Sequence, residues 1–287
     1  MTNLTEGNDK FRSIIIDALK MPGVKVDRVE FLTNLFSEKV DSKQLSLILE
    51  KGPVKAGIPI TKLDTMAKRL VNKRKLESAS ISAIAGFPGG LAIATTIPAD
   101  TLQFYALNLR LAQELRYLFG YKDLWSDNEL DTELVQGELI IYIGVMFGVS
   151  GASSAMKVLS SKIAEQIMKK LPRKALTKTF YYPIIKKSAQ MIGVKITKDT
   201  FAKGVAKGVP ILGGIVAGTI TWTTIKTMGI RLKNALYDSV VDYSVNDWKK
   251  DLDEVKKEMQ DIIDADFIEL EKDIIDEFNE DKEHIYQ

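Results

Sequence analysis

The chain has 287 residues, no cysteine and a formal net charge of +2, from 40 Lys and Arg against 38 Asp and Glu. With 45% hydrophobic and 27% charged residues, it is too apolar for a disordered chain and too charged for a conventional polytopic membrane protein. The absence of cysteine excludes disulfides and thiolate metal sites. The one histidine, His284, lies among the last few residues. We therefore expect no catalytic triad, no metal site and no cofactor.

Apolar residues recur at three- and four-residue spacing from the start of the chain, which predicts helices over residues 9–19 and 29–36 and from residue 63 onward. Alternating strand patterns are scarce. We expect an all-α protein, a multi-helix bundle with a glycine-rich buried helical core. The inward-facing residues of these first helices would be Phe11, Ile14, Ile15, Leu19, Val29, Leu32, Phe36, Leu63, Met66, Ala67 and Leu70.

Three segments carry no charge: residues 78–99, 139–156 and 208–225, of 22, 18 and 18 residues. Their lengths approach the ~20 residues that a helix needs to cross a bilayer, so they are either buried in the protein or in contact with lipid. Each contains two glycines at four-residue spacing, which predicts close helix packing. The residues concerned are Gly86 with Gly90, Gly144 with Gly148, and Gly214 with Gly218, together with Pro88.

The segment that follows residue 98 carries a polar stripe. Asp100, Gln103, Arg110 and Glu114 fall within one arc of a helix and are surrounded by apolar residues, which predicts a buried polar network. Arg110 can reach Glu114 at four-residue spacing.

Two roles remain open for Asp100. It either stabilises the first turn of the helix, where free amides favour an anion, or pairs with a basic side chain such as Lys226 or Arg231. In the second case, Arg110 would face a lipid phosphate or a carboxylate.

Charge is unevenly distributed along the chain. Residues 157–207 contain 13 basic and 2 acidic residues, a local charge of +11, which predicts a surface for an anionic partner. We do not expect that partner to be nucleic acid, because basic and aromatic residues beside apolar runs also fit an anionic membrane surface. The candidate contacts are Lys169, Lys170, Arg173, Lys174 and Lys178.

The last 41 residues, 247–287, contain 16 acidic and 6 basic residues, a charge of −10. Leu252, Val255, Met259 and Ile262 begin an apolar stripe that continues at helical spacing, so we expect an acidic amphipathic helix here and place a boundary between residues 1–246 and 247–287. The stripe would either fold back over the basic segment or pair two copies into a homo-oligomer.

Four sequence pieces, taken in order, resemble the EcsC family of bacterial proteins. They are residues 19–28 (LKMPGVKVDR), 86–103 (GFPGG, then IPAD and Gln103), 109–121 (LR to YLFGY) and 209–214 (VPILGG). The resemblance covers roughly residues 15–240. It implies association with membrane or transport processes in Gram-positive bacteria, and it carries no established catalytic residues and no substrate.

These observations favour a cytoplasmic, non-catalytic protein that is peripheral to the inner face of the cell membrane. Its expected partner is an anionic membrane lipid or a membrane protein, including an ABC transporter. Two alternatives stay open. One is a conditional membrane-inserting effector, and the other is an enzyme of unknown chemistry with a carboxylate site around Asp100 and Glu138.

Overall fold

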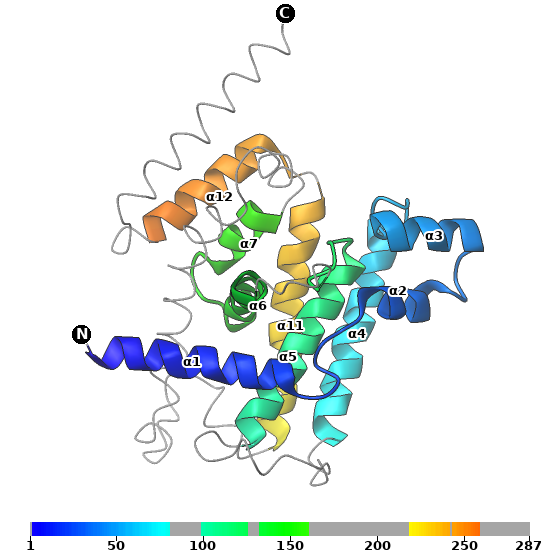
Figure 1. The fold of residues 1–287 in the computed structure, drawn as a ribbon. Coiled ribbons are helices and arrows are strands. Elements are labelled where there is room, and N and C mark those ends of the chain that lie inside the picture. The colour runs from blue at the N-terminus through cyan, green and yellow to red at the C-terminus, as the bar shows by residue number, and fades with distance from the viewer. Residues whose placement is uncertain (1, 81–98, 126–131, 161–217, 242, 259–287) are drawn as a thin grey trace, which may run out of the picture.

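The computed structural model describes residues 2–80, 99–125, 132–160, 218–241 and 243–258. The secondary-structure elements in this part of the chain are all helices (Figure 1). The prediction of an all-α fold is therefore confirmed. The helices are α1 (Thr2–Lys20), α2 (Arg28–Phe36), α3 (Ser42–Lys51), α4 (Ile60–Ser80), α5 (Ala99–Leu118), α6 (Thr132–Phe147), α7 (Ala152–Ser160), α11 (Gly218–Val240) and α12 (Val245–Glu258).

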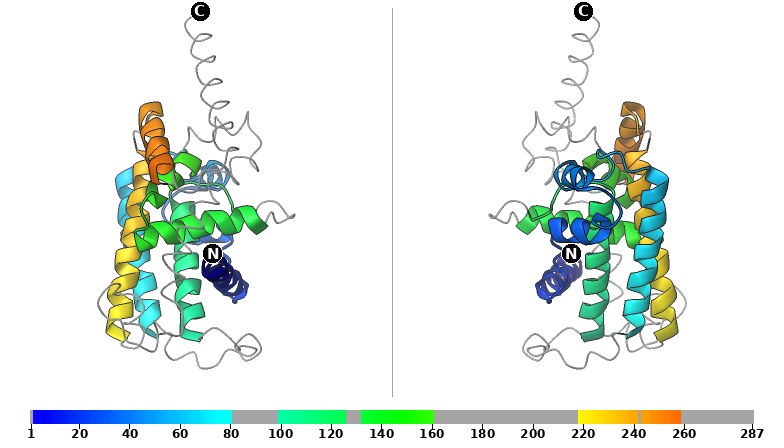
Figure 2. Two further views of the ribbon diagram at one scale, coloured as in Figure 1. Left: turned by 90° about the vertical axis from the view of Figure 1, so that its left-hand side faces the viewer. Right: turned by 90° about the vertical axis from the view of Figure 1, so that its right-hand side faces the viewer.

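Helix α5 is the centre of this arrangement. It contacts α1, α2, α4, α6 and α11, and its residues 111–118 are all buried. Helices α4, α5 and α11 run side by side, α1 runs across α5, and α6 runs across α5 and α11 (Figures 1 and 2). In α6, every residue from 139 to 146 is buried, as expected for a helix that is apolar on all sides.

Local sequence signals set where several helices begin and end. Asp27 and Asp41 cap α2 and α3, each accepting a hydrogen bond of 2.8 Å from the backbone N–H three residues later. Helix α5 ends at Leu118, and Gly120, two residues later, has a φ of 89° in the left-handed region. The N–H groups of Gly120 and Tyr121 return to the carbonyls of residues 117 and 116, which is the Schellman arrangement.

Most of the predicted inward-facing residues are buried, but Val29 is 54% exposed. The inner stripe of α2 is instead Arg28, Leu32 and Phe36, at four-residue spacing. Arg28 donates from Nε to the carbonyl of Tyr121 at 3.1 Å and from Nη1 to the carbonyl of residue 49 at 2.6 Å. Because these bonds satisfy the guanidinium, an arginine takes the position that the pattern assigned to valine. Burial lowers the pKa of Arg28 despite the nearby Asp123.

The uncharged run 139–156 is not a single helix. It comprises the end of α6, a turn, and the start of α7, and it lies largely in the protein core. Among the described residues, no helix combines the length and the apolar character needed to cross a bilayer. The greater part of each of the other two uncharged runs lies outside the described residues.

The predicted pairing of Gly148 with Gly144 on one helix face is wrong for Gly148, whereas Gly144 lies within α6. Gly148 lies just beyond α6 with a φ of 73°, so it ends the helix instead of flattening one of its faces. Among the described residues, a close helix approach occurs at Gly229 of α11, where a Cβ would lie 2.9 Å from Val71 Cγ1 and 3.0 Å from Leu111 Cδ2. Gly218 is the first residue of α11, whereas Gly86, Pro88, Gly90 and Gly214 lie outside the described residues.

The predicted C-terminal stripe begins inside the fold. Helix α12 starts at Val245 and packs against α7, so the boundary placed at residue 247 falls in its first turn. Trp248, Leu252 and Val255 are buried, and Trp248 Nε1 donates to the carbonyl of Val158 at 3.0 Å. The first part of the stripe is therefore covered by the same chain. Residues 259–287 lie outside the described residues.

Candidate functional site

The polar stripe predicted on residues 100–114 lies on α5, and the structure brings part of it together. Arg110 and Glu114 are in contact, whereas Gln103 is half-buried and about two turns before Arg110. Asp100 is the second residue of α5, and its side chain lies outside what the structure describes. The candidate site is therefore centred on Arg110 and Glu114.

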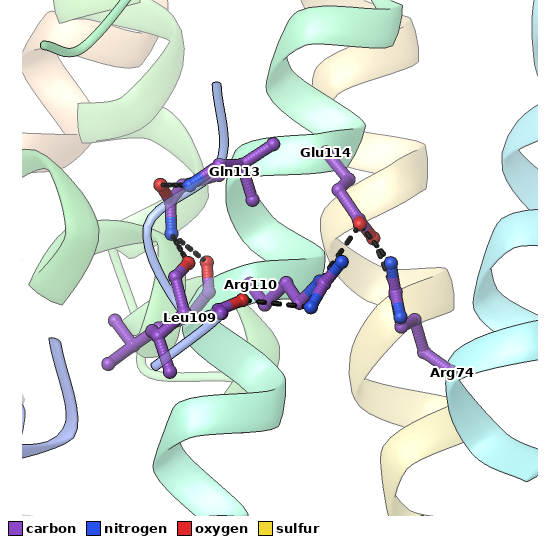
Figure 3. Close-up of polar contacts among 8 residues, drawn as sticks. Arg74, Leu109, Arg110, Gln113 and Glu114 are labelled. Carbon is purple, nitrogen blue, oxygen red and sulfur yellow. Dashed lines mark hydrogen bonds and ion pairs between the residues drawn. The ribbon is translucent and has the colours of Figure 1, made fainter. Parts of the chain in front are cut away.

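Glu114 is a buried carboxylate held by two arginines. Its side chain is 1% exposed, and it accepts a hydrogen bond of 2.7 Å from Nε of Arg74 and a second one from Nη2 of the same guanidinium. Nε of Arg110 donates to Glu114 Oε1 at 3.2 Å (Figure 3). A buried carboxylate loses its hydration, and the two guanidinium groups replace it with charge and hydrogen bonds. The bidentate pair also ties α4 to α5.

Arg110 is the more accessible of the two arginines, with a side chain 39% exposed against 8% for Arg74. Its Nη1 donates to the carbonyl of Gly23 at 2.9 Å, in the loop between α1 and α2. Gly23 has a φ of 77°, and a Cβ there would lie 3.2 Å from Arg110 Nη1. Glycine is favoured at this position by both the backbone angle and the close approach. The bonds at Nε and Nη1 fix the plane of the Arg110 guanidinium.

Gln113 is a site residue that the sequence did not single out. This buried amide donates from Nε2 to the carbonyls of Val24 and Leu109 at 2.8 and 3.0 Å. Its Oε1 accepts from the backbone N–H of Val26 at 3.1 Å and from Trp125 Nε1 at 3.0 Å. One amide thereby anchors the loop between α1 and α2 to α5 (Figure 3). In the sequence, Gln113 is marked only by being a polar residue on the inner side of an otherwise apolar stretch of the helix.

A groove of about 640 Å³ opens beside Arg110 and Glu114. It is lined by α2, α4, α5, the loop between α1 and α2, and Lys39 in the connection between α2 and α3. The apolar part of its lining includes Val26, Phe31, Leu35, Met66 and Leu70. Its cationic residues are Lys25, Lys39, Arg69, Lys73, Arg74 and Arg110.

The groove has an excess of positive charge, with six cationic residues against Asp27, Glu30 and Glu114. Two of these acids are already engaged, because Glu114 is paired with two arginines and Asp27 caps α2. The groove therefore offers an apolar surface next to cationic side chains, and these cations outnumber the carboxylates that line the groove. This chemistry suits an anionic amphiphile.

A second polar cluster lies at the C-terminal end of α5. Arg116 forms an ion pair of 3.1 Å with Glu138 of α6 and donates from Nε to Tyr142 Oη at 2.9 Å. Burial alone lowers the pKa of Arg116, but Glu138 and Tyr142 outweigh it and hold that pKa above its usual value. Glu138, one of the two carboxylates of the enzyme hypothesis, thus serves an ion pair between helices.

The side chain of Asp100 is outside the described residues, so its pairing with Lys226 or Arg231 stays a prediction. Arg231 of α11 donates from Nη1 to the carbonyl of Met146 at 3.2 Å, and its guanidinium lies against Gly148. Lys226 is exposed. The predicted anion-binding residues Lys169, Lys170, Arg173, Lys174 and Lys178 all lie outside the described residues.

Within the part of the chain that the structure describes, no cluster of three His, Asp or Glu side chains could hold a metal ion. In comparisons with known proteins, the chain matches no protein-family model, no curated protein and no solved structure. The resemblance to the EcsC family therefore stays a prediction.

Proposed function

We propose that the protein is a non-catalytic, peripheral membrane protein that binds anionic lipid at the inner face of the cell membrane. The observation that carries this proposal is the groove beside Arg110, where apolar side chains lie next to six cationic residues. Lys25, Lys39, Arg69 and Lys73 are all exposed around it.

The expected strength of the interaction follows from these four exposed cations. Each Lys or Arg close to an anionic bilayer contributes about 1 kcal/mol, so four would supply about 4 kcal/mol at moderate salt. Phe31 and Leu35 are only half-buried and offer apolar contact beside the charges. This combination favours a membrane surface over a fully polar anion.

The basic segment 157–207 and the resemblance to the EcsC family support the same proposal from the sequence. A membrane protein partner, such as an ABC transporter, is the alternative to lipid. Vesicles that contain lipid alone separate the two, because a transporter-dependent protein would not bind them.

The test is flotation of the full chain with vesicles of phosphatidylcholine, with and without phosphatidylglycerol. We expect binding only to the anionic vesicles, and weaker binding as salt increases. The variant Arg69→Gln/Lys73→Gln should reduce binding about tenfold or more. The matched control, Lys43→Gln/Lys62→Gln, removes the same charge from exposed positions outside the groove and should bind nearly as the wild type does.

A second variant addresses the basic segment, with Lys169, Lys170, Arg173 and Lys174 all changed to Gln. If only this variant loses binding, the membrane contact is the segment 157–207 and not the groove. Equal binding of the wild type to neutral and anionic vesicles would refute the proposal. Washing bound vesicles with carbonate strips a peripheral protein, so protein that stays bound would favour the conditional membrane-inserting effector.

A further inference from the structure

The position of Arg110 inside the groove suggests a more specific ligand than an anionic surface. Two of its nitrogens, Nε and Nη1, are used by Glu114 and Gly23. A guanidinium has five N–H groups, so those on Nη2 and the second one on Nη1 remain for a ligand as far as the described contacts go. With 39% of its side chain exposed, Arg110 can present them to the groove.

The fixed geometry of Arg110 matters for affinity. A long, flexible side chain usually loses conformational entropy when it binds a ligand. Here the buried carboxylate of Glu114 and the carbonyl of Gly23 already hold the guanidinium plane. Arg74, on the other side of Glu114, holds that carboxylate through its bidentate pair. The three side chains thus form a cation that is ordered before any ligand arrives.

The charge balance indicates the charge of the ligand. The groove carries six cationic residues and three acids, an excess of three positive charges. A phosphomonoester carries a charge of about −1.5 to −2 near neutral pH, whereas a phosphodiester carries a single negative charge. A terminal phosphate also presents oxygens that match the planar fork of an arginine.

Resting on the proposed function, we propose that the groove binds one phosphomonoester headgroup of an amphiphile, such as phosphatidic acid. Arg110 is its anion ligand, and Glu114 is the residue that positions Arg110. Lys25, Arg69 and Lys73 add charge around the phosphate. Phe31, Leu35 and Leu70 contact the first part of the apolar chains.

Calorimetric titration of the full chain with soluble, short-chain lipids tests this inference. We expect about one dioctanoyl phosphatidic acid per chain, bound at least tenfold more tightly than dioctanoyl phosphatidylglycerol or inorganic phosphate. Lowering the pH to about 5 protonates the phosphomonoester, whose second pKa is about 6, and should remove most of this preference. Equal affinity for phosphatidylglycerol would overturn the phosphomonoester assignment, and equal affinity for inorganic phosphate would overturn the amphiphile.

Variants of Arg110 separate geometry from charge. Charge-assisted hydrogen bonds contribute enough for Arg110→Gln to weaken binding of phosphatidic acid about ten- to a hundredfold. Arg110→Lys keeps the charge but loses the planar fork, so we expect it to lose most of the same affinity. Unchanged affinity in Arg110→Gln would overturn the role of Arg110, and wild-type affinity in Arg110→Lys would overturn the positioned fork.

Glu114→Gln separates attraction by charge from positioning of Arg110, because the two explanations predict opposite changes in the affinity for phosphatidic acid. It adds one net positive charge to the groove, so attraction by charge alone predicts tighter binding of phosphatidic acid. The positioning role predicts weaker binding, because Arg110 loses the carboxylate that fixes it. This variant is measured at a temperature where it is folded, and Arg110→Lys decides the point if it does not fold. If the wild-type protein binds phosphatidylglycerol vesicles but shows no preference for phosphatidic acid, this inference is refuted and the proposed function stands.

Discussion

The substitution Glu114→Gln should cost far more stability than Arg110→Gln, although the two residues are in direct contact. Glu114 is 1% exposed and faces Arg74, which is 8% exposed. Replacing the carboxylate with an amide leaves the Arg74 charge buried opposite a neutral group. Removal of one partner from a buried ion pair typically costs about 3–5 kcal/mol, so we expect a loss of that size in the free energy of unfolding.

Arg110→Gln removes a different kind of contact. The Arg110 side chain is 39% exposed, so water can hydrate its charge, and the bidentate pair between Arg74 and Glu114 stays in place. Ion pairs with such access to solvent contribute about 0–1 kcal/mol. The expected loss for Arg110→Gln is therefore about 1 kcal/mol. Arg74→Gln should fall between the two, because Glu114 would keep Arg110 as a partner.

Urea unfolding followed by far-UV circular dichroism measures all three variants. The slope of the free energy against urea should be the same in each, so that differences in midpoint report stability. The reasoning is refuted if Glu114→Gln unfolds within about 1 kcal/mol of the wild type, or if Arg110→Gln costs as much as Glu114→Gln. The first result would mean that water or its other contacts stabilise the charge of Arg74 without Glu114, and the second that Arg110 is the main partner of the carboxylate.

Three further predictions concern other parts of the fold. Gly229→Ala should destabilise by about 1–3 kcal/mol, because its Cβ would lie 2.9 Å from Val71 Cγ1; a more stable variant in urea would contradict this. Lys233 donates from Nζ to Asp64 Oδ1 at 2.5 Å. Burial raises the pKa of Asp64, but its bonds to Lys233 and Lys68 outweigh that and hold the pKa below its usual value. A carboxylate with a lowered pKa in the folded state stabilises the fold at pH values above its unfolded-state pKa, and this stabilisation is lost as the pH falls through the folded-state pKa. The wild type should therefore lose more stability than Asp64→Asn below about pH 4. Truncation after Asn246 should expose the apolar surface that α12 covers, seen as increased dye binding, and should increase vesicle binding if the acidic tail competes with lipid; a change from dimer to monomer in light scattering without that gain would favour pairing of two copies.

The helical fold and half of the candidate site could be predicted from the sequence because both depend on local spacing. Arg110 and Glu114 lie four residues apart, and the period of α5 alone places them on one face. Arg74 could not be predicted in the same way. It lies 40 residues before Glu114, and nothing in the local pattern of α4 distinguishes it from the other basic residues of that helix. Only the packing of α4 on α5 selects it.

The errors have physical causes of the same kind. Val29 fits the apolar period of α2, but Arg28 takes the buried position because two backbone carbonyls from other parts of the chain are there to accept its hydrogen bonds. Gly148 fits a small-residue packing pattern, but a glycine four residues after another also suits a helix end, and spacing alone does not separate the two uses. In both cases the deciding contact is distant in the sequence.

Helix α5 holds the groove in place, because it binds both the loop between α1 and α2 and the buried arginine of α4. Gln113 hydrogen-bonds the backbone of residues 24 and 26, Arg110 donates to the carbonyl of Gly23, and Glu114 forms an ion pair with Arg74 of α4. These three residues lie within five consecutive positions of one helix. Two residues further along, Arg116 ties the same helix to α6. A rotation or shift of α5 would break these contacts together, so the guanidinium of Arg110 has little freedom to move. A site built on a helix constrained in this way favours a ligand that needs exact placement of its oxygens, which is the demand that a phosphate makes and a diffuse anionic surface does not.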